Sequence, residues 1–137
     1  MKKILLVALI AVLFVLTGCS SLNGSDDINA FIAGNEELLT DAAVYGQHHR
    51  ALILPEVHNV YAEHDCVVFV TGKSGMLDDT RYGFYYSYDG DPAGAGYANS
   101  WRLTAEGDSF FWRDNLGRMD YHTHQLFGNW YYFEGTW

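Results

Sequence analysis

The chain has 137 residues, of which 17 are acidic and 8 basic, and its formal net charge is −9. This length suffices for one ordinary domain with a single core but hardly for two. A strongly acidic protein repels polyanions, so we expect no nucleic-acid partner and no direct attraction to anionic lipid headgroups.

The first nineteen residues have the order of an export signal that ends in a lipidation site. Lys2-Lys3 precede an apolar run from Ile4 to Leu16, which is shorter than the roughly 20 residues of a membrane-spanning helix. The run ends in Leu16-Thr17-Gly18-Cys19, which resembles the lipobox of bacterial lipoproteins. The resemblance implies cleavage before Cys19, which would carry covalent diacylglycerol and an N-acyl chain, with no other cofactor. A transmembrane anchor with a chance cysteine is the alternative.

The resemblance implies a location, and together with the composition and residue pattern of the rest of the chain it predicts a domain plan. Residues 1–18 would be a cleaved signal peptide, residues 19–35 the lipidated cysteine with a flexible tether, and residues 36–137 a single mainly-β domain. Without residues 1–18, six basic and 17 acidic residues remain, so the formal charge becomes −11. The acyl chains make attachment effectively permanent. We expect the protein in the cell membrane or outer membrane, with its domain outside the cytoplasm, and Ser20 favours the outer membrane.

Cys66 has no partner in the chain for a disulfide once Cys19 is acylated. It opens the apolar run Cys66–Val70, and this position predicts a buried and unreactive thiol.

The remaining elements follow in chain order. Small and polar residues dominate the tether, where Ile28, Phe31 and Ile32 could form a brief helical turn. Asn35 is the expected N-cap of one short helix over residues 36–45. After Gly46, short aromatic runs between glycine and acidic turns predict an antiparallel meander. The expected strands are Ala51–Leu54, Val57–Ala62, Cys66–Thr71, Tyr82–Tyr88, Ser100–Thr104, Ser109–Arg113, Arg118–Leu126 and Trp130–Glu134.

Side-chain alternation places aromatic residues on both faces of this sheet. Phe84 and Tyr86 share one side of their strand, and Tyr85 lies on the other. Tyr131 and Tyr132 likewise lie on opposite sides of their strand. We therefore expect a meander curled into a small barrel or sandwich, or a sheet with one exposed aromatic face.

Two groups of side chains could bind a ligand. Flat indole rings stack on sugars, so Trp101, Trp112, Trp130 and Trp137 are candidates for cell-wall glycan binding, although core packing accounts for most aromatic residues of a small β domain. His122 and His124 lie on one strand face at a spacing that can chelate zinc or copper. Glu63-His64-Asp65 and His48-His49 could add ligands, and solvated surface histidines are the alternative.

No nucleophile elbow or nucleotide-binding loop is present, which favours a protein that is not an enzyme. We expect a lipid-anchored, non-catalytic binding module of the cell envelope, whose partner is an envelope protein or a cell-wall glycan. A metal-dependent envelope enzyme that uses His122 and His124 is the alternative. Ser74-Gly75 and Arg81-Tyr82 also resemble a segment of small lysozyme-inhibiting lipoproteins, which would imply inhibition of a basic lysozyme. The spacing of these residues differs from that family, and once Cys19 is acylated the chain lacks a second cysteine for the disulfide expected there.

Overall fold

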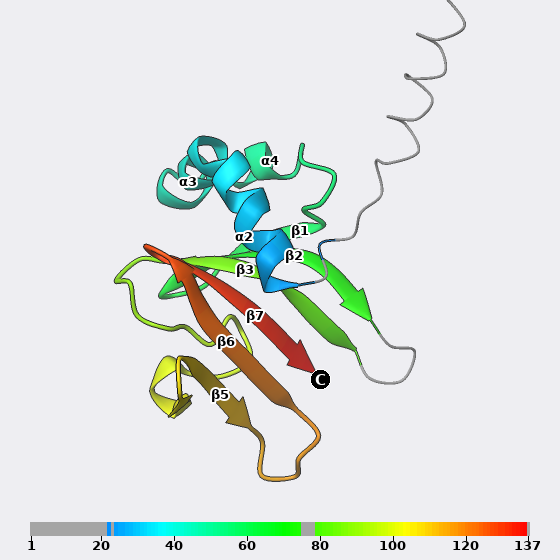
Figure 1. The fold of residues 1–137 in the computed structure, drawn as a ribbon, viewed down its shortest axis with the longest axis vertical. Helices are drawn as coiled ribbons and strands as arrows, with labels where there is room; N and C mark the ends of the chain where they lie inside the picture. Colours follow the sequence, from blue (N-terminus) through cyan, green and yellow to red (C-terminus); the bar gives the residue numbers. More distant parts are fainter. Residues whose placement is uncertain (1–21, 23, 75–78, 137) are drawn as a thin grey trace, which may run out of the picture.

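The computed structural model describes residue 22, residues 24–74 and residues 79–136, which have a mainly β fold (Figure 1). Three helices come first, namely α2 (Ser25–Gly34), α3 (Glu36–Val44) and α4 (His48–Ala51). The strands of this part of the chain are β1 (Asn59–Ala62), β2 (Cys66–Ser74), β3 (Thr80–Ser87), β4 (Thr104–Glu106), β5 (Ser109–Arg113), β6 (Asp120–Phe127) and β7 (Trp130–Thr136). A 3₁₀ helix, η1 (Ser100–Arg102), precedes β4.

All the described strands belong to one antiparallel sheet, in the order β1-β2-β3-β7-β6-β5-β4. The chain makes two meanders, β1 to β3 and β4 to β7, which join where β3 pairs with β7. The turns of the second meander contain Gly107, Gly117 and Gly128, all with positive φ, as the predicted hairpins require. The sheet is open, because β1 and β4 remain at its edges.

The three helices pack against one face of the sheet, on the part formed by β2, β3 and β7 (Figure 1). On α2, Ile28 and Ile32 lie one turn apart and are fully buried against strand residues such as Phe84. The flexible tether predicted for residues 19–35 is therefore wrong over α2, because these two side chains gain their burial only when the segment is helical and packed. The buried residues of this helix-side core are Leu22, Ile28, Ile32, Leu39, Ala42, Ala43, Ala51, Val57, Val67, Phe69, Phe84, Trp130 and Tyr132.

The long connection between β3 and β4, residues 88–103, covers part of the opposite face. It contributes Ala93, Ala95 and Tyr97 to a second cluster, termed the loop-side core. The buried residues of this cluster are Cys66, Val68, Val70, Ala93, Ala95, Tyr85, Tyr97, Tyr121, Tyr131 and Phe133. Because both faces are covered at the centre of the sheet, the aromatic residues predicted on both faces are core residues there.

Three local predictions differ from the structure. Ala51–Leu54 is not a strand: Ala51 ends α4, and its carbonyl accepts the N–H of Leu54 in a turn. Residues 100–102 form η1, so the strand predicted over Ser100–Thr104 begins only at Thr104. The side chain of Asn35 makes no cap bond to α3 and instead donates to the carbonyl of Phe31, 2.9 Å away. Short apolar runs and cap residues fit several local structures, and packing decides among them.

Residues 1–21, which include the predicted signal and Cys19, lie outside the described residues, as does Trp137. Within the described part of the chain, no helix is long and apolar enough to span a bilayer.

Candidate functional site

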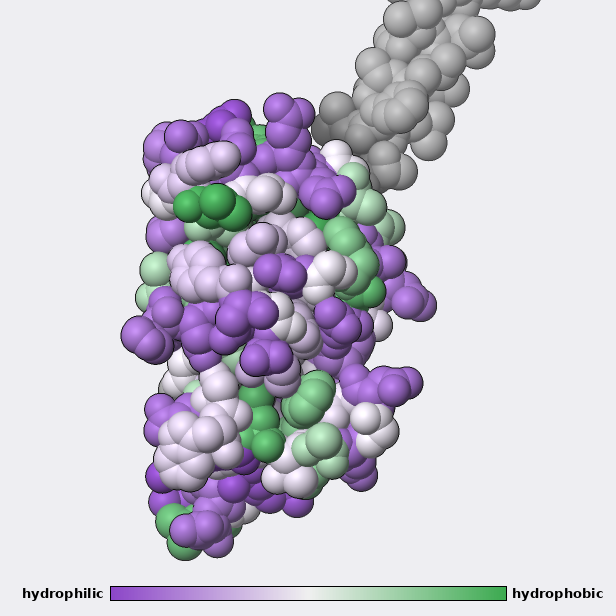
Figure 2. Space-filling model, turned by 90° about the vertical axis from the view of Figure 1, so that its left-hand side faces the viewer, coloured by the Kyte–Doolittle hydropathy of each residue, from purple (hydrophilic) through white to green (hydrophobic). Residues whose placement is uncertain are grey.

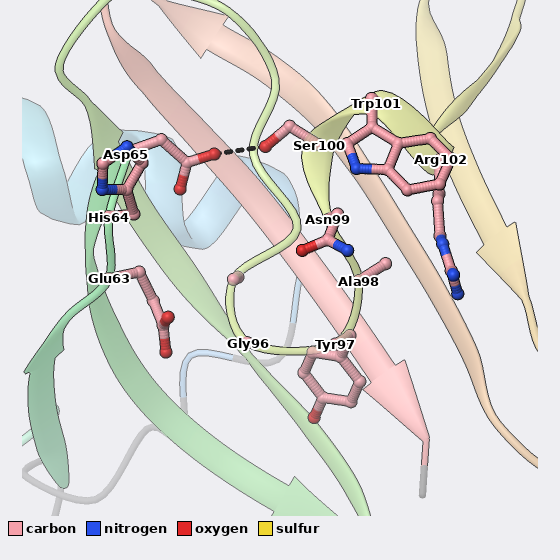
Figure 3. Close-up of a pocket in the computed structure, with 11 residues that line it drawn as sticks. Glu63, His64, Asp65, Gly96, Tyr97, Ala98, Asn99, Ser100, Trp101 and Arg102 are labelled. Atoms are coloured by element: carbon pink, nitrogen blue, oxygen red, sulfur yellow. Dashed lines mark hydrogen bonds between the residues drawn. The ribbon is translucent and has the colours of Figure 1, made fainter.

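A polar pocket lies between the β1–β2 turn and the second half of the 88–103 connection (Figure 3). Its volume is about 540 Å³. Glu63, His64 and Asp65 line it on the turn side, and residues 95–102 line it on the other. The pocket therefore joins two segments that lie at least thirty positions apart in the sequence, and the folded sheet brings them together.

Tyrosine hydroxyl groups hold the 88–103 connection on the sheet. Three of them belong to strand residues and donate to backbone carbonyls of the connection, and the fourth belongs to the connection and donates to a carbonyl of β7. These bonds run from Tyr61 Oη to the Ala95 carbonyl (3.1 Å), Tyr97 Oη to the Gly135 carbonyl (3.1 Å), Tyr121 Oη to the Ala93 carbonyl (2.7 Å) and Tyr131 Oη to the Gly90 carbonyl (2.7 Å). These four tyrosine side chains therefore position this segment.

A buried hydrogen-bonded chain runs through Tyr85. Its hydroxyl accepts the N–H of Ala93 at 2.9 Å and lies 2.9 Å from Thr123 Oγ1. Because Thr123 donates its single hydroxyl proton to the carbonyl of Tyr132 at 2.6 Å, Tyr85 must be the donor to Thr123. Burial raises the pKa of Tyr85, which keeps this donor protonated.

The connection begins in a tight polar turn. Ser87 Oγ lies 2.8 Å from a carboxylate oxygen of Asp89 and 2.7 Å from the carbonyl of Asp91. The N–H of Asp91 donates to the same Asp89 oxygen at 3.0 Å, and this bond, with that from Ser87, lowers the pKa of Asp89. The carboxylate therefore remains charged and serves the turn.

The two walls of the pocket are linked by one side-chain hydrogen bond. The hydroxyl of Ser100 donates to a carboxylate oxygen of Asp65 (Figure 3). On the floor, Gly96 has a φ of +85°, and a Cβ added there would lie 3.3 Å from Oε1 of Glu63. Glycine thus permits both the left-handed backbone and the close approach of the Glu63 carboxylate.

An exposed indole forms the rim of the pocket. Trp101 is 77 % exposed, although large aromatic side chains are usually buried. The guanidinium carbon of Arg102 lies 4.9 Å from the centre of the indole ring, within the range of a cation–π attraction. Trp101 therefore presents a flat apolar surface beside the carboxylates of the pocket.

The four predicted tryptophan ligands do not share one surface. Trp101 lines the pocket, whereas Trp112 is half-buried against the loop-side core. Trp130 is 3 % exposed and packs among Phe69, Phe84 and Tyr86, so its predicted ligand-binding role is wrong. Trp137 lies outside the described residues.

The predicted histidine pair does lie together on β6. The ring centres of His122 and His124 are 5.7 Å apart. Burial, together with the nearby His122, lowers the pKa of His124, and Asp26 on α2 opposes this shift. Among the residues that the structure describes, no group of three His, Cys, Asp or Glu side chains could hold a metal ion. Glu63-His64-Asp65 lines the polar pocket instead.

Cys66 is fully buried, and burial followed by the negative charge of Asp65 raises the pKa of its thiol. It lies on β2 in the loop-side core, beneath the connection that forms the pocket. A protonated, inaccessible thiol is a poor nucleophile, as the apolar run predicts.

The pocket was only partly foreseeable. Glu63 and Asp65 were candidate metal ligands in the sequence, but no sequence pattern predicted that they would lie opposite Ser100 and Trp101. No protein-family model matches the chain, and no curated protein or solved structure matches it.

Proposed function

We propose that this chain is a lipid-anchored protein of the cell envelope, whose domain binds a cell-wall glycan without catalysis in the pocket beside Trp101. The lipobox-like Leu16–Cys19 supports the anchor and the envelope location, with the domain on the far side of the membrane from the cytoplasm. The alternative is that the ligand is an envelope protein.

The exposed indole beside a polar cavity is the observation that carries the glycan proposal. A sugar ring has an apolar face that stacks on an indole, and hydroxyl groups that need hydrogen-bond partners. Trp101 offers the flat surface, and Glu63, Asp65 and Asn99 offer polar groups around it. Ligand sites commonly combine aromatic contact with a few orienting polar groups.

The arrangement of the polar groups favours binding over catalysis. Ser100 donates directly to Asp65. In a serine-type triad a histidine lies between these two residue types and removes the hydroxyl proton. In Figure 3 the His64 ring lies on the turn side and does not come between Ser100 and Asp65. Ser100 and Asp65 therefore serve to join the pocket walls.

Glycan binding is tested by titrating the protein with soluble cell-wall glycan fragments while following heat and tryptophan fluorescence. Trp101→Ala should weaken binding about fivefold, because aromatic stacking contributes about 1 kcal/mol. Tyr45→Ala is the matched control, since Tyr45 is also an exposed aromatic residue but lies outside the pocket. Equal affinity of wild type and Trp101→Ala would contradict the glycan site, and capture of a specific envelope protein by in-cell crosslinking would favour the alternative.

The anchor is tested separately. Intact mass should reveal acyl groups such as palmitate on the protein, and Cys19→Ala should release it from the membrane fraction. Membrane retention of an unacylated Cys19→Ala variant would contradict the lipobox interpretation. The metal-dependent enzyme rests on His122 and His124 alone, and an unchanged melting temperature with and without zinc would count against it.

A further inference from the structure

Exposed apolar side chains gather around α4. Val44, Tyr45, Leu52 and Ile53 are all exposed, and Ile53 is 72 % exposed. No acidic residue lies between Asp41 and Glu56, although the chain contains 17 of them. Single exposed apolar residues are ordinary, but four that flank one short helix indicate a contact surface. These four residues are termed the apolar tip.

The chain leaves little distance between the predicted lipid anchor and the folded domain. Leu22, the first described residue, is buried in the helix-side core, only three residues after Cys19. Three residues span at most about 10 Å when fully extended. An acyl-bearing Cys19 lies at the bilayer surface, so the anchor holds the helical layer close to the lipid.

The apolar tip belongs to this same layer. Leu22 shares the helix-side core with Ala51 and Val57, which flank Leu52 and Ile53 in the sequence, and Leu54 packs against it. Figure 1 shows α3, α4 and the connection to β1 at one end of the molecule and the hairpin between β5 and β6 at the opposite end. The described chain begins beside the helices and not beside that hairpin (Figure 1), so a short anchor brings the end that carries the apolar tip to the membrane.

We propose that the apolar tip inserts into the interfacial layer of the bilayer as a second membrane contact beside the lipid anchor. The proposal rests on the proposed lipidation of Cys19. Tyr45 has the amphipathic ring that is enriched at headgroup level, and Leu52 and Ile53 supply apolar area. Because the mature chain carries a formal charge of −11, a zwitterionic lipid surface is the fitting partner.

The test places a nitroxide label on the apolar tip of the acylated full-length protein in phosphatidylcholine vesicles. Ile53→Cys gives one labelling site, because Cys66 is buried and Cys19 is acylated. Leu116→Cys is the matched control, since Leu116 is similarly exposed at 68 % but lies in the hairpin between β5 and β6. The ratio of oxygen to nickel-chelate accessibility should be severalfold higher at position 53 than at position 116.

Two results would overturn the proposal on acylated protein. Equal, water-like accessibility at both positions would show that the apolar tip stays in solvent. Protection at position 53 without vesicles would show a protein contact instead. Intact mass is measured on the same sample, so a chain without acyl groups would overturn the anchor itself and be told apart from a failure of the apolar tip alone.

The space-filling view in Figure 2 shows that apolar residues are scattered among polar ones on the face it presents. Hydrophilic residues occupy most of that face, as expected for a surface in contact with water.

Discussion

Replacing Tyr85 with phenylalanine removes one buried hydroxyl and leaves the ring in place. The ring is stacked on Tyr131 with centres 5.1 Å apart, so packing should be preserved. The hydroxyl links the N–H of Ala93 to Thr123 Oγ1, and thereby fixes the 88–103 connection to β3 and β6. Tyr85→Phe thus tests whether hydrogen bonds from the sheet position the connection that forms the pocket.

The expected cost follows from the groups that lose a partner. Thr123 keeps its bond to the carbonyl of Tyr132, but the N–H of Ala93, which is almost fully buried, loses its acceptor. An unsatisfied buried donor costs about 1–3 kcal/mol, so the free energy of unfolding should fall by that amount. Thr123→Val should cost a similar amount, because the Tyr85 hydroxyl then loses its acceptor.

Urea unfolding of the two single variants and the double variant measures these changes in the free energy of unfolding. The double variant should cost less than the sum of the single variants by about 1 kcal/mol, since Tyr85 and Thr123 belong to one chain of bonds. Hydrogen exchange should show loss of protection at the amide of Ala93 in Tyr85→Phe. Tyr45→Phe, at an exposed hydroxyl, should change stability by less than about 0.5 kcal/mol. An unchanged midpoint and unchanged Ala93 protection in Tyr85→Phe would refute the reasoning.

Two further predictions concern α2 and β6. Ile28→Ala should lower the free energy of unfolding by about 2–5 kcal/mol, because removal of a fully buried side chain leaves a cavity. If urea unfolding shows a decrease of less than about 0.5 kcal/mol, the segment behaves as a tether. Since the pKa of His124 is lowered in the folded protein, the unfolded chain binds the proton more tightly. Stability should therefore be full above the ordinary histidine pKa of about 6.5 and fall as the pH drops through the lower folded value. His124→Gln should flatten this dependence in thermal melts at pH 5 to 8, whereas the exposed-site control His49→Gln should keep it; equal slopes in the two variants would contradict the assignment.

Local pattern predicted much of the sheet. The alternation in Tyr82–Tyr88 places Phe84 and Tyr85 on opposite faces, and the structure confirms both positions. The helix over residues 36–45 is confirmed to within one residue as α3. These features depend on neighbours in the sequence, namely side-chain periodicity and turn residues, and so they can be predicted without a partner segment.

The α2 helix was harder to predict, because its sequence pattern alone only weakly indicates a helix. Ile28 and Ile32 have helical spacing, but a helix of only ten residues is marginal in isolation. Its stability comes from packing on the sheet, which the sequence does not display. The burial of Trp130 could not be predicted for the same reason, because it depends on helices that lie about a hundred positions earlier in the chain.

By itself, the sequence determined the acidic charge, the β class, the hairpin turns and the lipobox resemblance, because each depends on composition or on residues within one short segment. Only the tertiary structure decided which aromatic residues are core, that Tyr85 holds a loop, and that Trp101 lies beside Asp65. These features arise from the insertion of β7 beside β3 and from the coverage of both sheet faces, which brings together residues far apart in the chain.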